Sequence, residues 1–117
     1  MPTYRELLNQ VKAEIEEIDA QAAAPALGDA TTVWLDVREM NEWDEGHIPG
    51  AQHLFLGNLE QLSEGLSRDT PIVLHCQGGS RSAIGASLLR ARGFTNVSNM
   101  EGGFDAWRKQ GLPVEDE

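Results

Sequence analysis

The distribution of apolar and polar positions divides the chain into alternating segments typical of strands and helices. Two continuous apolar runs with β-branched residues, at 31–37 and 71–76, predict buried strands, and a third strand is predicted at 96–100. Helical spacing of apolar residues predicts helices at 83–92 and 104–110. Strands that alternate with helices in this way indicate an α/β domain with a mostly parallel sheet covered on both faces.

The N-terminal part of the chain carries two further helical patterns. Apolar residues recur at helical spacing across 3–18 and predict one amphipathic helix, which Thr3 is placed to cap. Asp19 is placed to cap a second, short helix over 20–27, which Gly28 ends.

Three shorter elements lie between the first two predicted strands. They are a helix at 38–45, a short strand within 51–56 and a small helix within 57–68. The whole pattern fits one domain, because 117 residues with a mass of 12.8 kDa suffice for one hydrophobic core.

The charge balance of the chain is strongly acidic. Its 9 basic and 19 acidic residues give a net charge of −10. Such a surface repels phosphodiester backbones and anionic lipid headgroups, so neither nucleic acid nor a membrane is expected as a partner. The apolar runs are far shorter than the roughly 20 residues of a membrane-spanning helix, and the first residues lack the pattern of a secretory signal. We therefore expect a cytoplasmic protein.

Cys76 is the single cysteine of the chain. One cysteine excludes an internal disulfide and a multi-thiolate zinc site, and no metal site is expected. The residue ends a predicted strand and precedes a glycine-containing loop, which is where parallel α/β sheets bind ligands. Amides around Gly78 and Gly79 would form an anion-binding nest, and the next helix would add its positive end.

A small buried residue without a chemical role is the alternative interpretation of a lone cysteine. The two glycines and Arg81 favour a reactive thiolate instead, because amide N–H groups and positive charge stabilise that form. No aspartate or glutamate lies between Thr70 and Met100, whereas Arg81, Arg90 and Arg92 do. The local sequence therefore favours a small anion beside a thiolate.

Three stretches of the chain, in the same order, resemble rhodanese-like sulfurtransferases. Residues 75–82 (HCQGGSRS) are similar to the active-site loop of that family, and residues 36–51 (DVREMNEWDEGHIPGA) resemble its upstream signature. Residues 93–97 and 100–107 together resemble its closing signature. The resemblance covers residues 16–114 and implies a rhodanese-like domain, with about five strands in a mostly parallel sheet and helices on both faces.

The resemblance implies a sulfurtransferase in which Cys76 takes up a sulfane sulfur as a persulfide and passes it on. The donor would be a small anion such as thiosulfate or another persulfide, and the acceptor would be cyanide, a thiol or a partner protein. The loop would bind the donor through its backbone, and Arg81 would hold or steer the anion; the residues concerned are Gln77, Gly78, Gly79, Ser80, Arg81 and Ser82. Asp36 and Arg38 would brace this loop as an ion pair. No cofactor or metal is implied.

The other polar candidates are expected to have structural roles. His75 precedes Cys76 on an extended strand, where neighbouring side chains point to opposite faces, so it is a poor general base for the thiol. His47 is expected to be a hydrogen-bonded structural histidine. The acidic residues that follow the first strand are expected on a solvated helix face; they are Glu39, Glu42, Asp44 and Glu45.

Two other functions stay open on this fold. The first is a non-catalytic docking or regulatory module, although inactive relatives often lack the cysteine that this chain keeps. The second is a phosphatase or arsenate reductase, which resembles this family but has five residues between cysteine and arginine. Here four residues separate Cys76 from Arg81, and the smaller ring suits a single sulfur better than a tetrahedral phosphate. The oligomeric state is left open.

The resemblance also divides the chain into parts. It implies a short strand at 16–18 and a helix at 20–27, so the helix predicted from periodicity would end earlier. Residues 1–15 would then form an amphipathic helical extension, residues 16–114 the rhodanese-like domain and residues 115–117 an acidic tail.

Overall fold

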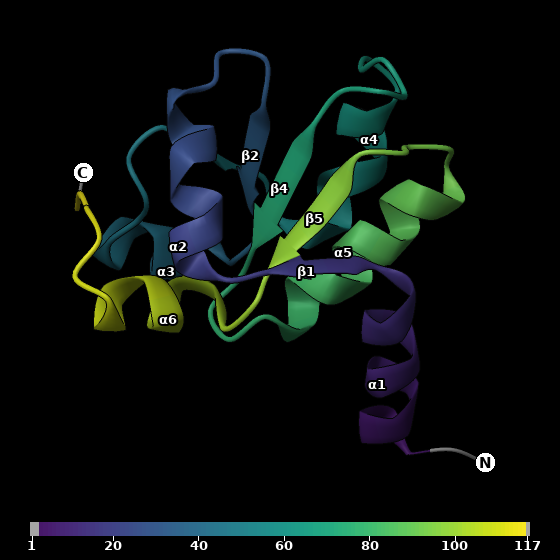
Figure 1. Ribbon diagram of the computed structural model, residues 1–117, viewed down its shortest axis with the longest axis horizontal. Coiled ribbons are helices and arrows are strands. Elements are labelled where there is room, and N and C mark those ends of the chain that lie inside the picture. Colours follow the sequence, from purple (N-terminus) through teal and green to yellow (C-terminus); the bar gives the residue numbers. More distant parts are fainter. Residues whose placement is uncertain (1–2, 117) are drawn as a thin grey trace.

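A single sheet of five parallel strands forms the centre of the molecule (Figure 1). The structure is a computed structural model that describes residues 3–116, without the side chains of residues 12, 14, 62 and 63. The strands are β1 (Glu16–Ile18), β2 (Val33–Asp36), β3 (Gln52–His53), β4 (Ile72–His75) and β5 (Val97–Met100), in the order β1-β5-β4-β2-β3. Because all pairs are parallel, the strands end at the same edge of the sheet, and the central strand β4 delivers the cysteine loop to the middle of that edge.

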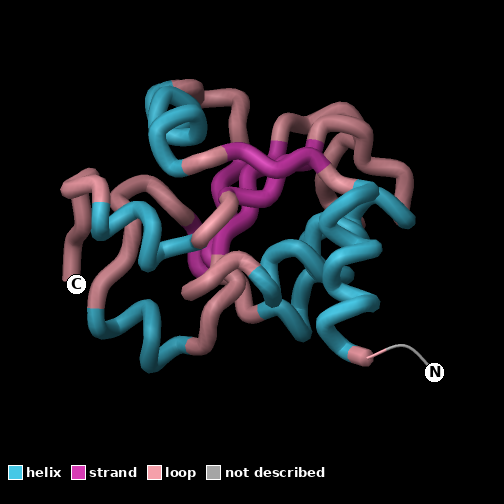
Figure 2. Tube along the Cα trace, turned by 60° about the horizontal axis from the view of Figure 1, so that its bottom comes forward, coloured by secondary structure: helices cyan, strands magenta, loops and turns pink. Residues whose placement is uncertain are grey.

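Helices enclose this sheet on both sides, as the tube in Figure 2 shows. They are α1 (Tyr4–Glu14), α2 (Ala20–Ala23), α3 (Met40–Glu45), α4 (Leu59–Ser63), α5 (Ser80–Ala91) and α6 (Gly103–Lys109), with short 3-10 helices at Ala24–Gly28 and Leu56–Asn58. The predicted fold class is therefore confirmed. None of the helices within residues 3–116 combines the length and the apolar character needed to cross a bilayer.

The alternation of side chains along the central strands divides the core into two clusters. Leu35, Ile72 and Leu74 pack with α1, α4 and α5 on one face. Trp34 and Val73 point to the other face, where they pack with α2 and α6. Both faces of β2 and β4 are thus buried, which explains why these strands are continuous apolar runs in the sequence.

The prediction of one helix over 3–18 is wrong at its end. Helix α1 ends at Glu14, and β1 pairs with β5 so that Glu16 lies opposite Ser98. Ile15 packs in the cluster under α1 and α5, whereas Ile18 packs against the cluster on the other face. Residues three apart lie on the same side of a helix but on opposite faces of a strand, so this burial requires the strand.

The predicted caps of the first two helices are present. The Glu6 N–H donates to Thr3 Oγ1 at 3.2 Å, and the Ala22 N–H donates to Asp19 Oδ1 at 2.7 Å. In α1, Leu8 and Val11 pack against the core, whereas Leu7 is 47% exposed. The division into an extension, a domain and a tail stays a prediction, and residues 1–2 and 117 of it lie outside the described part of the chain.

Several predicted boundaries differ from the observed ones. Helix α5 begins at Ser80 instead of residue 83, because Gly79 takes the N-cap position. The helix predicted at 38–45 begins at Met40, and the strand predicted within 51–56 is limited to two residues that pair with the end of β2. The helix predicted within 57–68 is a 3-10 turn followed by the short α4. The earlier start of α5 matters most, since it places Ser80, Arg81 and Ser82 in the first helical turn.

Candidate active site

Cys76 follows the last residue of β4 and lies at the centre of the sheet edge. Its side chain continues the face of Ile72 and Leu74, and the residue is 1% exposed. Gln77, Gly78 and Gly79 then turn the chain into α5. The sulfur is therefore enclosed between the end of the central strand and the beginning of the longest described helix.

Two hydrogen-bond donors point at the cysteine sulfur. The Gly79 N–H donates to Cys76 Sγ at 3.1 Å, and the Ser82 hydroxyl donates at 3.4 Å. Gly79 has a φ of +101°, and a Cβ there would lie 3.2 Å from the Gly102 nitrogen. Only glycine adopts this backbone without strain, and the turn it makes is what aims the amide at the sulfur. Both donors stabilise negative charge on Sγ.

The beginning of α6 holds the cysteine loop through two backbone hydrogen bonds. The Phe104 N–H donates to the Cys76 carbonyl at 2.8 Å, and the Asp105 N–H donates to the Gln77 carbonyl at 3.0 Å. This approach requires Gly103, where φ is +57° and a Cβ would lie 2.3 Å from the Cys76 oxygen. Sequence reasoning assigned no role to Gly103. The adjacent Gly102 and Gly103 of the closing signature indicate a close approach of two backbone segments. The sequence does not indicate which segment they approach.

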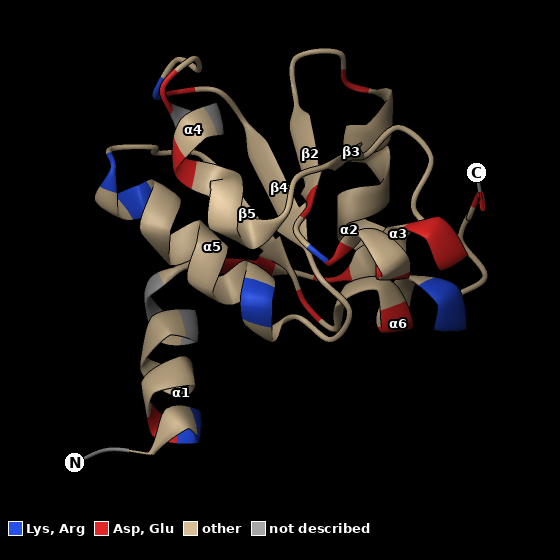
Figure 3. Cartoon of the chain, turned by 180° about the vertical axis from the view of Figure 1, so that it is seen from behind, with Lys and Arg blue, Asp and Glu red and all other residues tan. Residues whose placement is uncertain are grey.

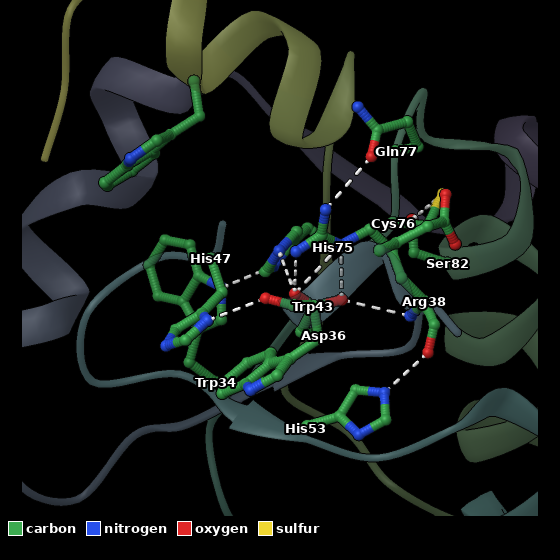
Figure 4. A network of polar contacts seen from close by, with 12 residues as sticks. Trp34, Asp36, Arg38, Trp43, His47, His53, His75, Cys76, Gln77 and Ser82 are labelled. Atoms are coloured by element: carbon green, nitrogen blue, oxygen red, sulfur yellow. Dashed lines mark hydrogen bonds and ion pairs between the residues drawn. The ribbon is translucent and has the colours of Figure 1, made fainter. Parts of the chain in front are cut away.

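The Gln77 side chain is turned away from the sulfur and fixed at both ends of its amide. Arg38 Nη1 donates to Gln77 Oε1 at 3.1 Å (Figure 4). Gln77 Nε2 donates to Asp105 Oδ1 at 2.6 Å. Of the loop residues predicted to bind the donor, Gly79 and Ser82 contact Sγ directly. Gly78 is exposed, nothing lies within 4 Å of a Cβ placed on it, and its φ is outside the left-handed region, so the predicted need for glycine is observed at Gly79 and not at Gly78.

Asp36 and Arg38 form the ion pair that the family resemblance implied. Arg38 Nε and Nη2 donate to the Asp36 carboxylate at 2.9 and 2.7 Å, and both side chains are almost fully buried. Nη2 also donates to the Gly46 carbonyl at 2.8 Å, and the guanidinium lies over the Phe104 ring. Burial alone would raise the pKa of Asp36, but the close contact of His75 and the hydrogen bonds from Arg38 outweigh it and hold that pKa well below its ordinary range. The ion pair holds Arg38 in the position from which its Nη1 donates to Gln77 in the loop.

His75 lies on the face of β4 opposite Cys76. Its Nδ1 accepts from Trp34 Nε1 at 2.8 Å, and its Nε2 lies 3.3 Å from Asp36 Oδ2. Complete burial lowers the pKa of His75, although the Asp36 carboxylate opposes this. The imidazole is therefore a neutral member of the buried polar network and is not directed at the thiol.

Arg81 and Glu42 form an ion pair beside the loop, which corrects the expectation for Glu42. Arg81 Nη1 and Nη2 donate to the two Glu42 carboxylate oxygens at 2.7 and 3.0 Å. Glu42 was expected on a solvated helix face, but α3 packs so that its carboxylate pairs with Arg81. That Arg81 holds or steers the anion stays a prediction. Hydrogen bonding by Arg81 lowers the pKa of Glu42, and hydrogen bonding by Glu42 raises the pKa of Arg81.

The remaining histidines have structural contacts. His47 stacks on Trp43 at a centroid distance of 3.7 Å, and its Nδ1 lies 3.0 Å from the Trp43 carbonyl oxygen. His53 Nε2 lies 2.8 Å from the Arg38 carbonyl oxygen. The part of the chain that the structure describes contains no group of three or more His, Cys, Asp or Glu arranged to hold a metal ion.

Comparison with known proteins identifies the family. Residues 19–110 match the family described as "Rhodanese-like domain". The chain belongs to the rhodanese-like family. The thiosulfate sulfurtransferase GlpE of Pseudomonas fluorescens is 34% identical over 85 residues, which are 73% of this chain and 78% of that protein.

Two further relatives extend the comparison. The uncharacterized protein YqhL of Bacillus subtilis is 42% identical over 73 residues, which are 62% of this chain, and the chain spans 58% of that protein's length. The solution structure of the polysulfide-sulfur transferase homodimer from Wolinella succinogenes superposes with a TM-score of 0.84 at 29% identity, covering 97% of this chain and 88% of that one. The rhodanese-like chain is thus similar to proteins named as sulfurtransferases.

Proposed function

We propose that this rhodanese-like protein is a sulfurtransferase that carries a sulfane sulfur as a persulfide on Cys76. The observation that carries the proposal is the pair of donors, the Gly79 N–H and the Ser82 hydroxyl, directed at a buried cysteine sulfur. The donor is a sulfane-sulfur anion such as thiosulfate or another persulfide, and the acceptor is cyanide, a thiol or a partner protein. A cytoplasmic location belongs to the same proposal, because a reactive thiol is preserved in a reducing compartment.

The reaction consists of two displacements at sulfur. The Cys76 thiolate attacks the outer sulfur of the donor, a new S–S bond forms, and the bond to the leaving sulfite or thiolate breaks with its electron pair. The acceptor nucleophile then attacks the outer sulfur of the persulfide, and the Cys76 thiolate leaves. Both steps concentrate negative charge where the Gly79 and Ser82 donors point, which is where preorganised donors accelerate a reaction.

The length of the loop supports sulfur over phosphate as the group transferred. Four residues separate Cys76 from Arg81, and the guanidinium is engaged with Glu42. A phosphoryl group has three peripheral oxygens that need donors, whereas the outer sulfur of a persulfide is one atom.

Intact-protein mass spectrometry after incubation with a sulfane-sulfur donor tests the proposal. The expected result is a gain of one sulfur atom, removable by cyanide with formation of thiocyanate. Cys76→Ser should remain folded and should neither gain sulfur nor form thiocyanate. Unchanged turnover in Cys76→Ser, or no adduct in the parent protein with thiosulfate, a thiosulfonate or a persulfide, would overturn the assignment.

A further inference from the structure

The two arginines beside the cysteine loop each have a carboxylate partner. Arg38 is paired with Asp36 in the interior, and Arg81 is paired with Glu42 through two hydrogen bonds. Each pair sums to no net charge. The attraction for an anion at Cys76 is therefore left to the backbone amides, the Ser82 hydroxyl and the positive end of α5.

The other arginines of the acid-free stretch lie at the far end of α5. Arg90 and Arg92 stand in its last turn and at its C-cap, and Arg92 forms an ion pair with Glu60. A helix of 12 residues is about 18 Å long, beyond the Debye length at physiological salt. Figure 3 shows the basic positions separated in this way, at the two ends of α5. Their charges do not assist binding at the cysteine.

The surface next to the Arg81–Glu42 pair is apolar and acidic. A hollow beside α3 is lined by Glu39, Met40, His53, Leu54, Phe55 and Asn58, and this lining contains no lysine or arginine. Met40 is 58% exposed and Phe55 is 46% exposed. The charge of Glu39 also acts on Arg81. The cation that a doubly charged donor meets on this side is Arg81, and Arg81 is already paired with the Glu42 carboxylate.

We propose that Glu42 determines the class of sulfur donor. Because Glu42 holds Arg81, the site selects donors in which the outer sulfur and its neighbouring group together carry one negative charge. Thiosulfonates and persulfides are such donors, and the thiosulfate dianion is not. The inference rests on the proposed sulfur transfer at Cys76. Glu42 acts as a positioning residue, because it touches Arg81 and does not contact the sulfur. The Arg81 and Glu42 side chains are 37% and 23% exposed, so replacing Glu42 leaves a guanidinium that water can solvate and a donor can reach.

Methanethiosulfonate and thiosulfate provide matched probes of this selection. The first differs from the second by a methyl group in place of one charged oxygen. In either case the Cys76 thiolate forms a bond to the outer sulfur. The bond to the inner sulfur breaks, and its electron pair leaves with methanesulfinate or with sulfite. The two donors thus test the same step and differ in charge.

The experiment compares kcat/KM for the two donors, with cyanide as the acceptor, in the parent protein, Glu42→Gln and Asp44→Asn. Asp44 is an exposed carboxylate on the same helix and is the matched control for the loss of one negative charge. We expect Glu42→Gln to raise the preference for thiosulfate over methanethiosulfonate about tenfold, and Asp44→Asn to change it less than about twofold. Added salt should reduce the Glu42→Gln effect, and Glu42→Asp, which keeps the charge, should remain closer to the parent.

The outcomes separate this inference from the proposed function. If the parent transfers sulfur and Glu42→Gln has the parent's donor preference while it is folded, the role of Glu42 is wrong and the Cys76 chemistry stands. An equal change in Asp44→Asn also overturns it, because the effect would then be one of overall charge. If neither donor forms a persulfide in the parent, both the function and the inference fail.

Discussion

The Asp36–Arg38 pair and the Glu42–Arg81 pair have the same chemistry in opposite surroundings. The first joins residues two apart in sequence and is almost completely buried. The second joins residues 39 apart and is partly exposed. Both pairs lie beside the cysteine loop and differ in burial. Comparing them therefore indicates how burial changes the role of an ion pair.

From this comparison we infer that the buried pair has a structural role, whereas the partly exposed pair sets the charge beside the loop. Arg38 is almost completely buried, so Asp36 takes the place of water in compensating its charge, and Arg38 contacts the loop through Gln77. Exposed ion pairs add little to stability because water solvates each partner alone. We therefore expect Glu42 to influence chemistry at the loop more than it influences folding. Three of the four predictions below test this contrast, and the Gly103 variant tests the backbone support of the same loop.

Asp36→Asn should have the largest effect on stability. The substitution keeps the shape of the side chain but leaves Arg38 buried without a counter-charge, which costs about 3–5 kcal/mol. The free energy of unfolding in urea, measured at neutral pH, checks this. A loss no greater than that of Glu42→Gln would remove the distinction between the two pairs.

Gly103→Ala should have the second largest effect. The new Cβ would meet the Cys76 carbonyl oxygen at 2.3 Å in a backbone with a φ of +57°. We expect a loss of roughly 2–3 kcal/mol and a displaced cysteine loop, seen as slower persulfide formation. The matched control for stability is Gly78→Ala, because a Cβ on Gly78 would have no neighbour within 4 Å. The free energy of unfolding of this variant should lie within about 0.5 kcal/mol of that of the parent.

Acid should weaken the fold through Asp36. Its pKa is lower in the native state than the ordinary 3.8, so the unfolded chain binds the proton first as pH falls. The stabilisation is complete above pH 3.8 and is lost as pH falls towards the native pKa. Between pH 5 and pH 3 this carboxyl should account for a loss of about 1 kcal/mol, which Asp36→Asn lacks. Identical acid sensitivity of the two proteins in urea unfolding would contradict this origin.

Glu42→Gln should have the smallest effect on stability. Its partner can be hydrated, so the free energy of unfolding should fall by less than about 1 kcal/mol, with less dependence on added salt than in the parent. Urea unfolding at low and high ionic strength measures both quantities. A loss comparable to that of Asp36→Asn would show that the pair stabilises the fold.

Much of the fold is predictable from local pattern, because strands that are buried on both faces appear in the sequence as continuous apolar runs. The strands at 33–36, 72–75 and 97–100 lie inside the predicted segments, and the fold class follows from their alternation with helices. The helix predicted over 3–18 is wrong only at its end, because the apolar spacing of Ile15 and Ile18 suits a helix, whereas their burial in different clusters depends on pairing with β5.

By itself, the sequence determined the order of strand, cysteine, glycine turn and helix, since each depends on neighbouring residues and their backbone preferences. It therefore indicated Cys76 and the donor-rich turn after it. Only the tertiary structure decided that α3 brings Glu42 to Arg81 and that Gly103 lies under the Cys76 carbonyl. The acid-free stretch around Cys76 suggested free positive charge, but a charge acts through space. The neutralising carboxylate comes from 39 residues away, where packing and not sequence position sets the distance.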